Sequence, residues 1–205
     1  HMSGLHRDVY LVATPQTFVR DHVITAQLDA SKSYTSGKME VSLELDNRHK
    51  LSGTKQVKVT LLDADNKVVK TATTAVNYTA AATTNKAKVT LDGLANLKPW
   101  TAETPYLYNV VVAQQDDKGK EEMVFNTKYG FRNIEIKNGL VLINGKRVFF
   151  KGVNTQDTHP EKGRTMDVPT MLRDIFMMKQ ANVNTVRTSH YPRQPKMYAM
   201  FDYYG

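Results

Sequence analysis

Polar side chains that could do chemistry gather in two stretches near the end of the chain. The first stretch contains Asn154, Asp157 and Glu161, and the second, 187–192, reads Arg-Thr-Ser-His-Tyr-Pro. Two carboxyl groups about 5 Å apart can divide the roles of acid and nucleophile between them. Asp157 and Glu161 belong to one predicted loop, and nothing in their spacing sets such a distance. We therefore reject them as a catalytic pair.

The elements that must position these side chains alternate between strand and helix. Short strands are predicted at 149–154 and 184–187, and helices at 168–181 and 194–204. This order is typical of a βα-repeat fold. Closing a (β/α)8 barrel takes roughly 250 residues, and only about two repeats fit before Gly205. We therefore expect residues 126–205 to be the N-terminal portion of a truncated barrel domain.

The first of these helices carries its own start signals. Asp167 is a suitable N-cap, and Pro169 falls in the first turn, where its missing N–H does no harm. The spacing places an apolar face on one side, with Met171 and Met178 beside it. The residues expected on that face are Leu172, Ile175, Phe176 and Lys179.

The first 125 residues read as a series of short strands. Several runs alternate between apolar and polar residues, so one face is buried and the other solvated. Polar turns separate the runs, and no helical period intervenes, which is typical of an antiparallel sandwich of immunoglobulin-like size. The predicted strands are 9–12, 17–28, 39–45, 57–61, 68–71, 88–91, 107–112 and 123–125.

Two Asn-Gly pairs follow the sandwich. Asn138-Gly139 and Asn144-Gly145 separate the apolar runs 134–136, 140–143 and 148–150. Asn-Gly is a strong hairpin signal because both residues accept the positive φ of a type I′ turn. The predicted fold is therefore mainly β: an immunoglobulin-like sandwich at 1–125, these hairpins, and about two βα repeats.

Composition excludes several classes of site. The 205 residues include no cysteine, which excludes disulfides, thiolate metal sites and a cysteine nucleophile. His6, His22 and His49 have no partner spacing that suggests a metal site. No apolar run approaches a membrane span and no signal peptide is recognisable. We therefore expect a soluble protein. The opening His1-Met2 resembles a tag remnant, so the compartment, cytoplasmic or periplasmic, cannot be read from this end.

The net charge of +8 is unevenly distributed. Residues 1–125 hold 15 Lys+Arg against 14 Asp+Glu, whereas residues 126–205 hold 13 against 6. A nucleic-acid surface would interleave basic and aromatic residues on one groove or sheet. Here the basic residues are scattered through both strands and helices. We interpret the excess as a segment that faces acidic residues elsewhere, and expect neither a nucleic-acid nor a membrane partner.

The ordered motifs of the chain resemble family 2 of the glycoside hydrolases, of the beta-galactosidase type. Arg187 to Pro192 is similar to the family's signature around the second barrel strand. Other stretches agree with it in order along essentially the whole chain. They are Ser3-Gly4 with Arg7-Asp8-Val9, Trp100 to Tyr108, Gly130-Phe131-Arg132, Gly152-Val153-Asn154, His159-Pro160, Met178-Lys179-Gln180, and Met197-Tyr198 with Asp202 and Gly205.

The resemblance implies a fragment of a longer hydrolase, the parent protein, which cleaves terminal beta-galactosides with retention. The family uses two glutamates on later barrel strands, so this chain should be inactive by itself. It implies that His190 lies in the sugar subsite, that Arg187 orients the nucleophilic carboxylate, and that Asn154 serves the same pocket. Where many beta-galactosidases have a histidine after the Gly-Val-Asn motif, this chain has Gln156, which changes the expected substrate contacts. Any Mg or Na ions of the parent would be held by residues outside this chain.

Purely structural roles are an alternative for several of these residues. His159 could simply satisfy its own loop, and Trp100, Tyr106 and Tyr108 could be packing residues rather than a sugar platform. The rival function is a non-catalytic sandwich module that binds carbohydrate or another protein. Nucleic-acid binding by the basic part is a weaker rival. The expected partners are a beta-galactoside, the rest of the parent chain and, through uncovered sheet edges, other copies of the fragment.

Overall fold

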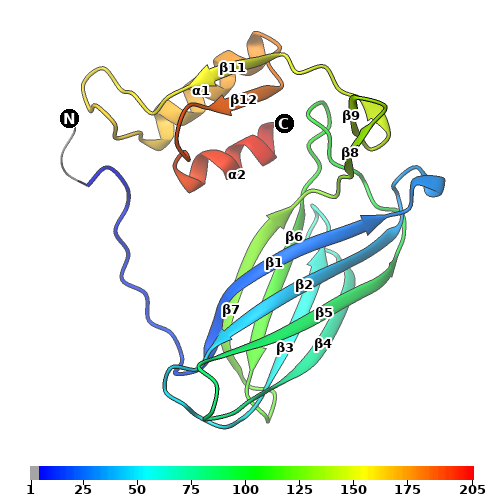
Figure 1. Ribbon diagram of the computed structural model, residues 1–205, viewed down its shortest axis with the longest axis vertical. Coiled ribbons are helices and arrows are strands. Elements are labelled where there is room, and N and C mark those ends of the chain that lie inside the picture. The colour runs from blue at the N-terminus through cyan, green and yellow to red at the C-terminus, as the bar shows by residue number, and fades with distance from the viewer. Residues whose placement is uncertain (1–4) are drawn as a thin grey trace. The chain divides into compact units, whose positions relative to one another are not determined.

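Seven antiparallel strands build a two-layered sandwich in the computed structural model, which describes residues 5–205 (Figure 1). One layer has the order β1-β2-β5 and the other β4-β3-β6-β7. A division into three and four strands is the arrangement of an immunoglobulin-type sandwich, so this prediction is confirmed. The strands are β1 Phe18–Leu28, β2 Gly37–Asp46, β3 Gly53–Leu62, β4 Val68–Tyr78, β5 Thr84–Leu94, β6 Tyr108–Gln115 and β7 Glu121–Tyr129.

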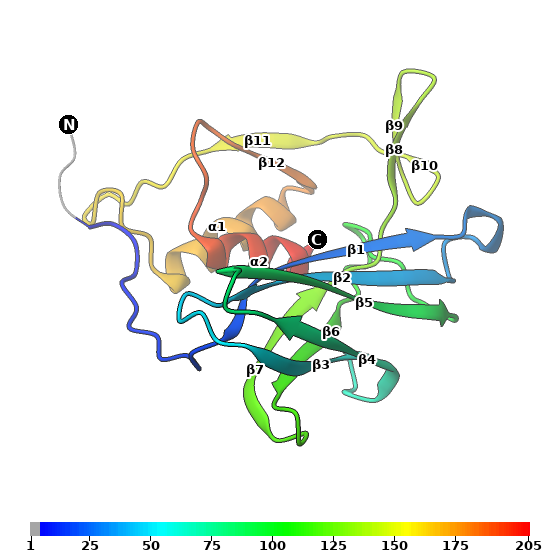
Figure 2. The same ribbon diagram turned by 60° about the horizontal axis from the view of Figure 1, so that its bottom comes forward.

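The sandwich core follows from the alternation in the sequence. Successive side chains of a strand point to opposite faces, so every second residue of β2 and β3 faces the other layer. These residues are fully or almost fully buried, and the equivalent positions of β6 join them. The central members are Met39, Val41, Leu43, Leu45, Val57, Val59, Leu61, Val110 and Val112. The two layers are visible edge-on in Figure 2.

The aromatic residues just before β6 and at its start pack within the sandwich. Trp100 and Tyr108 are buried, and the Tyr108 ring packs edge-on against Phe131, with 5.0 Å between ring centroids. Tyr106 is partly buried against the same core. The Arg132 guanidinium lies over the Trp100 ring. The interpretation of these rings as packing residues is confirmed.

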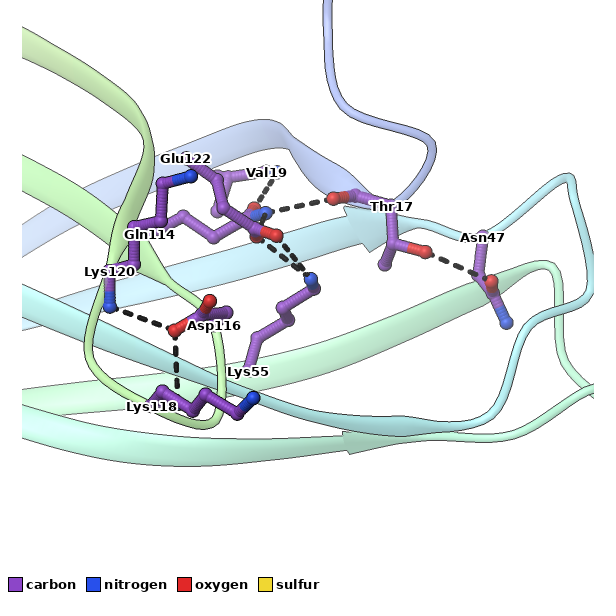
Figure 3. Close-up of polar contacts among 9 residues, drawn as sticks. All are labelled: Thr17, Val19, Asn47, Lys55, Gln114, Asp116, Lys118, Lys120 and Glu122. Carbon is purple, nitrogen blue, oxygen red and sulfur yellow. Dashed lines mark hydrogen bonds and ion pairs between the residues drawn. The ribbon is translucent and has the colours of Figure 1, made fainter.

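A buried glutamine joins the two layers of the sandwich. Gln114 of β6 accepts a hydrogen bond from the Val19 N–H at 2.9 Å and donates to the Thr17 carbonyl at 2.8 Å. Its amide also donates to Glu122, which is paired with Lys55 at 2.8 Å (Figure 3). Register shifts interrupt β1 after Val19 and β6 after Gln114. The side chain therefore satisfies a backbone N–H of β1 and the carbonyl of Thr17, which directly precedes β1.

Two predicted strands are wrong. Residues 9–12 and 148–150 are not strands, and Tyr10, Leu11, Phe149 and Phe150 are all exposed. Apolar, β-branched residues favour a strand only when a neighbouring strand supplies ladder bonds and side-chain contacts. Neither segment has such a partner among residues 5–205. His1-Met2, which we interpreted as a tag remnant, and the Ser3-Gly4 part of the first motif lie outside the described residues.

Both Asn-Gly hairpins are confirmed. They connect β8 Ile134–Lys137, β9 Leu140–Ile143 and the short β10 Lys146–Arg147. Asn138 and Gly139 have φ of 51° and 73°, and Asn144 and Gly145 have φ of 50° and 73°, as a type I′ turn requires.

The boundary expected at residue 126 falls inside β7, because this strand stays paired with β6 as far as Tyr129.

A second compact unit contains the βα segment, separate from the unit of Val12–Trp100 and Tyr106–Lys146. Its elements are β11 Gly152–Thr155, α1 Val168–Gln180, β12 Thr185–Thr188 and α2 Pro195–Tyr204. The strands β11 and β12 pair in parallel, and α1 and α2 share a small core of Met166, Met171, Ile175 and Met197. The segment thus consists of two βα repeats whose strands are parallel, as predicted.

The predicted apolar face of α1 needs correction, because Leu172 is only half-buried and Lys179 is exposed. Met171 and Ile175 are the buried residues, with Met178 packed against them, whereas Phe176 is 47% exposed. The spacing of i, i+4 and i+7 puts these three on one stripe, and Phe176 lies beside it. The N-cap prediction is confirmed, because the Asp167 carboxylate accepts from the Thr170 N–H at 3.0 Å.

We expect Gln114→Ala to lower the free energy of unfolding of the sandwich by about 2–4 kcal/mol, because it orphans the buried Val19 N–H and Thr17 carbonyl. Trp100, the only tryptophan, is buried in this unit and reports its unfolding in urea by fluorescence. Gln115→Ala, at the adjacent and partly exposed position, is the matched control. Equal effects of the two substitutions would contradict the role of Gln114.

We expect Asp167 to make the stability of α1 depend on pH. Hydrogen bonds from the side chains of Lys162 and Thr170 hold the pKa of Asp167 far below its ordinary value. A carboxyl whose folded pKa is depressed contributes stability above its unfolded pKa of about 4 and loses it as the pH falls further. Amide exchange in the first turn of α1 should therefore be faster in Asp167→Ala than in wild type at pH 7, and the difference should shrink toward pH 2.

The control for this measurement is Asp117→Ala, which removes an exposed carboxylate from the turn after β6. It should leave amide exchange in α1 unchanged at every pH. A difference between wild type and Asp167→Ala that stays constant from pH 7 to pH 2 would contradict the ionic part of the cap.

Candidate functional site

The parallel pairing of β11 with β12 sets the geometry of the candidate site. Asn154 lies directly opposite Arg187 in the ladder, and both are near the C-terminal ends of their strands. The two strands run side by side in Figure 1. Opposite residues of a ladder project to the same face of the sheet, so an amide and a guanidinium that are 33 residues apart come together.

His190 completes this group. One guanidinium nitrogen of Arg187, Nη1, is 3.4 Å from the Asn154 Oδ1, and the other, Nη2, is 3.4 Å from the His190 Nδ1. Both distances are longer than a typical N–H···O bond, so the contacts are loose. All three side chains are exposed. The structure brings the three predicted site residues together, and their role toward a substrate stays a prediction.

The chemistry available to these three side chains is recognition. The Arg187 guanidinium offers a planar fork of donors that matches a carboxylate. The Asn154 amide can donate and accept, and the His190 imidazole can bind a hydroxyl through a ring nitrogen. None of them supplies a carboxyl group, so the group can hold a polar ligand and orient a carboxylate from elsewhere.

The neighbouring residues of the first loop take different roles. His159 accepts hydrogen bonds at its Nδ1 from the backbone N–H groups of Glu161 and Lys162, both at 3.1 Å. Its ring thus satisfies its own loop, as one interpretation of the sequence proposed. Gln156, the departure from the family pattern, is exposed.

Asp157 is not available as a reactive carboxylate. Its side chain is 2% exposed and pairs with Arg193 through one oxygen and with Arg7 through the other, the latter at 2.8 Å. Glu161, its rejected partner, is exposed. Two guanidinium groups therefore occupy both oxygens of Asp157, in agreement with the rejection of this pair.

Sequence reasoning did not single out Arg193 as a buried residue. An arginine between a proline and a glutamine resembles any solvated cation, and arginines are rarely fully buried. The side chain is nevertheless completely buried. Its charge also reaches Asp174 on α1: burial raises the pKa of Asp174, and the Arg193 guanidinium opposes that rise. No periodicity in the sequence signals this arrangement.

A hollow of about 840 Å³ opens beside the buried ion pair of Asp157 and Arg193. Its lining comes from the N-terminal segment and the two loops, and includes Arg7, Asp157 and Tyr191 but none of the three predicted site residues. The Arg164 guanidinium lies 4.8 Å from the centroid of the Tyr191 ring. The hollow and the predicted site are therefore distinct features of this unit.

Two kinds of feature are absent from the described part of the chain. Within residues 5–205, no three histidine or carboxylate side chains are grouped so as to hold a metal ion. Neither α1 nor any other helix in that range is long and apolar enough to cross a membrane.

Known proteins resemble the chain over its whole length. A family model described as glycosyl hydrolases family 2 matches residues 17–132, and the TIM barrel domain of the same family matches residues 134–205. A beta-galactosidase of Alteromonas mediterranea is 37% identical over 216 residues, and one of Halalkalibacterium halodurans is 39% identical over 205 residues. These matches cover 100% and 99% of this chain but 19% of each relative, so the chain spans about a fifth of their length.

Solved structures agree on the fold. A glycosyl hydrolase family 2 member from Bacteroides cellulosilyticus matches with a TM-score of 0.85 at 22% identity, over 94% of this chain and 24% of that one. A beta-glucuronidase from Ruminococcus gnavus matches with a TM-score of 0.76 at 25% identity, over 93% of this chain and 29% of that one. By the family models that match its sandwich and its barrel segment, the chain belongs to glycosyl hydrolase family 2.

Proposed function

We propose that this chain is part of a retaining glycosidase that hydrolyses terminal beta-galactosides, and that it supplies one wall of the substrate pocket. The observation that carries the proposal is the meeting of Asn154, Arg187 and His190 at the C-terminal ends of two parallel strands. That end of a βα barrel is where active sites are built.

The choice of sugar rests on the relatives. Several beta-galactosidases are 35–39% identical to this chain. Several beta-glucuronidase structures are 20–25% identical, a range in which the fold is shared more widely than the substrate. We therefore favour a galactoside over a glucuronide.

In this proposal each residue has a separate task. The His190 imidazole binds a sugar hydroxyl and strengthens that bond as charge develops at the ring, without transferring a proton. The Arg187 guanidinium orients the carboxylate nucleophile, and Asn154 holds Arg187 and a second hydroxyl. Retention requires two carboxyl groups about 5–5.5 Å apart. We assign both to glutamates in sequence beyond Gly205, since Asp157 is held by two arginines.

We expect the chain alone to release no chromophore from a nitrophenyl beta-galactoside above the buffer rate, because it lacks the carboxyl pair. The protein should be made in a host without its own beta-galactosidase, so that any signal belongs to the chain. The parent protein, which carries the remaining barrel, is the positive control. Turnover that follows the purified chain would overturn the assignment of the carboxyl pair to missing sequence.

In the parent protein, we expect His190→Ala to lower kcat/KM for a beta-galactoside by about 10²–10³-fold, because the lost hydrogen bond matters most in the transition state. His49→Ala, at an exposed position of the sandwich, should leave kcat/KM unchanged. The assay is steady-state hydrolysis of nitrophenyl beta-galactoside, with the beta-glucuronide measured in parallel. Wild-type kinetics in His190→Ala would remove this residue from the site, and a preference for the glucuronide would overturn the choice of sugar.

A further inference from the structure

We propose that Asp157 and Arg193 form a positioning pair, which sets the distance between Asn154 and His190. This inference rests on the proposed function, in which those two residues contact the sugar. The pair itself touches no substrate. Its task is to join the loop that follows β11 to the loop that follows β12, so that the two strand ends present their side chains in one arrangement.

Burial is the first observation. The Arg193 side chain is 0% exposed and the Asp157 side chain 2% exposed. Removing two opposite charges from water is costly, and the attraction between them repays this cost only with excellent geometry and further hydrogen bonds. Arg193 Nη2 is buried without a hydrogen-bond partner in the described part of the chain. A pair of this kind adds little net stability, which points to a role in fixing position.

The second observation is where the pair is attached. Arg193 Nη1 donates to the hydroxyl of Thr155, the residue directly after Asn154. The Asp157 backbone N–H donates at 2.8 Å to the hydroxyl of Tyr191, the residue directly after His190. Each loop thus bonds to the immediate neighbour of the other loop's site residue. A shift of one loop would move Asn154 relative to His190.

The third observation is that the N-terminal segment closes the arrangement. Arg7 Nη2 pairs with the second oxygen of Asp157 at 2.8 Å and donates to the Pro192 carbonyl at 3.3 Å. Its side chain is 29% exposed, so this arm is the weaker of the two. The backbone N–H of Arg193 donates to the Tyr198 hydroxyl of α2 at 2.9 Å. Three separate parts of the chain therefore meet at one aspartate–arginine pair.

The test compares Asp157→Asn and Arg193→Lys with wild type in this chain. Asp157→Asn removes the charge, while Arg193→Lys keeps the charge but loses the fork that reaches Thr155. Lys196→Ala is the matched control, because it breaks an exposed ion pair with Asp8 in the same unit. NMR follows the Asn154 side-chain amide and the His190 ring, and hydrogen exchange follows the amides of β11, β12, α1 and α2.

We expect both variants to move the Asn154 and His190 signals and to speed exchange at the ends of β11 and β12 by about tenfold or more. Exchange around Ile175 in the core of α1 should stay within about twofold of wild type, as should every amide in Lys196→Ala. Unchanged Asn154 and His190 signals, or an equal loss of protection in α1 and α2, would overturn the positioning role. If Asp157→Asn unfolds the unit, Arg7→Ala takes its place, because it removes only the weaker ion pair of Asp157. The same NMR signals and exchange rates are then compared with wild type.

These measurements use no sugar, so they judge the pair independently of the proposed function. In the parent protein, Arg193→Lys should lower kcat for the beta-galactoside about tenfold with a smaller change in KM, as a misaligned site does. Altered NMR signals with an inactive parent protein would reject the proposed function while keeping the pair. An active parent with unaltered signals in both variants would reject the pair while keeping the function.

Discussion

The candidate site depends on the parallel register of β11 and β12. Four residues of each strand pair in order, and the third pair is Asn154 with Arg187. Because side chains alternate along a strand, a slip by one residue would send Arg187 to the opposite face. The distances from Arg187 to Asn154 and His190 would then no longer exist. The register is held by four ladder positions only, so the loops beyond the strands must contribute to it.

Electrostatics explains how those loops do so. The second part of the chain is strongly basic, with 13 Lys+Arg against 6 Asp+Glu from residue 126 onward. One of the few acids, Asp157, is shared by two arginines that come from opposite ends of the chain. In a region with so few anions, several cations pair with the same buried carboxylate. Arg7 and Arg193 thereby hold the N-terminal segment and the loop after β12 against Asp157. The local excess of positive charge thus favours an arrangement in which two arginines share one aspartate.

The sandwich is held together mainly by burial of apolar side chains. Its core is formed by alternating aliphatic residues of β2, β3 and β6. The buried amide of Gln114 bonds to backbone groups of Val19 and Thr17, close to the irregularity in β1 (Figure 3). Burial of apolar area supplies most of the stability of such a unit. In the proposed function this unit is a scaffold, and the three candidate site residues lie in the βα segment.

Local patterns were sufficient for most of the fold. Short apolar runs between polar turns, several of them alternating with period two, identified all seven sandwich strands. The two Asn-Gly pairs identified their hairpins, and Asp167 with Pro169 identified the start of α1. These features depend on residues close in sequence, so the sequence alone determines them. The same local reasoning was wrong at 9–12 and 148–150, where apolar residues have no strand to pair with. The three site residues were found by motif, and their proximity followed only from the pairing of strands 33 residues apart. The burial of Arg193 and its bond to Asp157, with Arg7 arriving from 150 residues away, were decided by tertiary structure alone, because the cost of burying a charge depends on partners that no local pattern encodes.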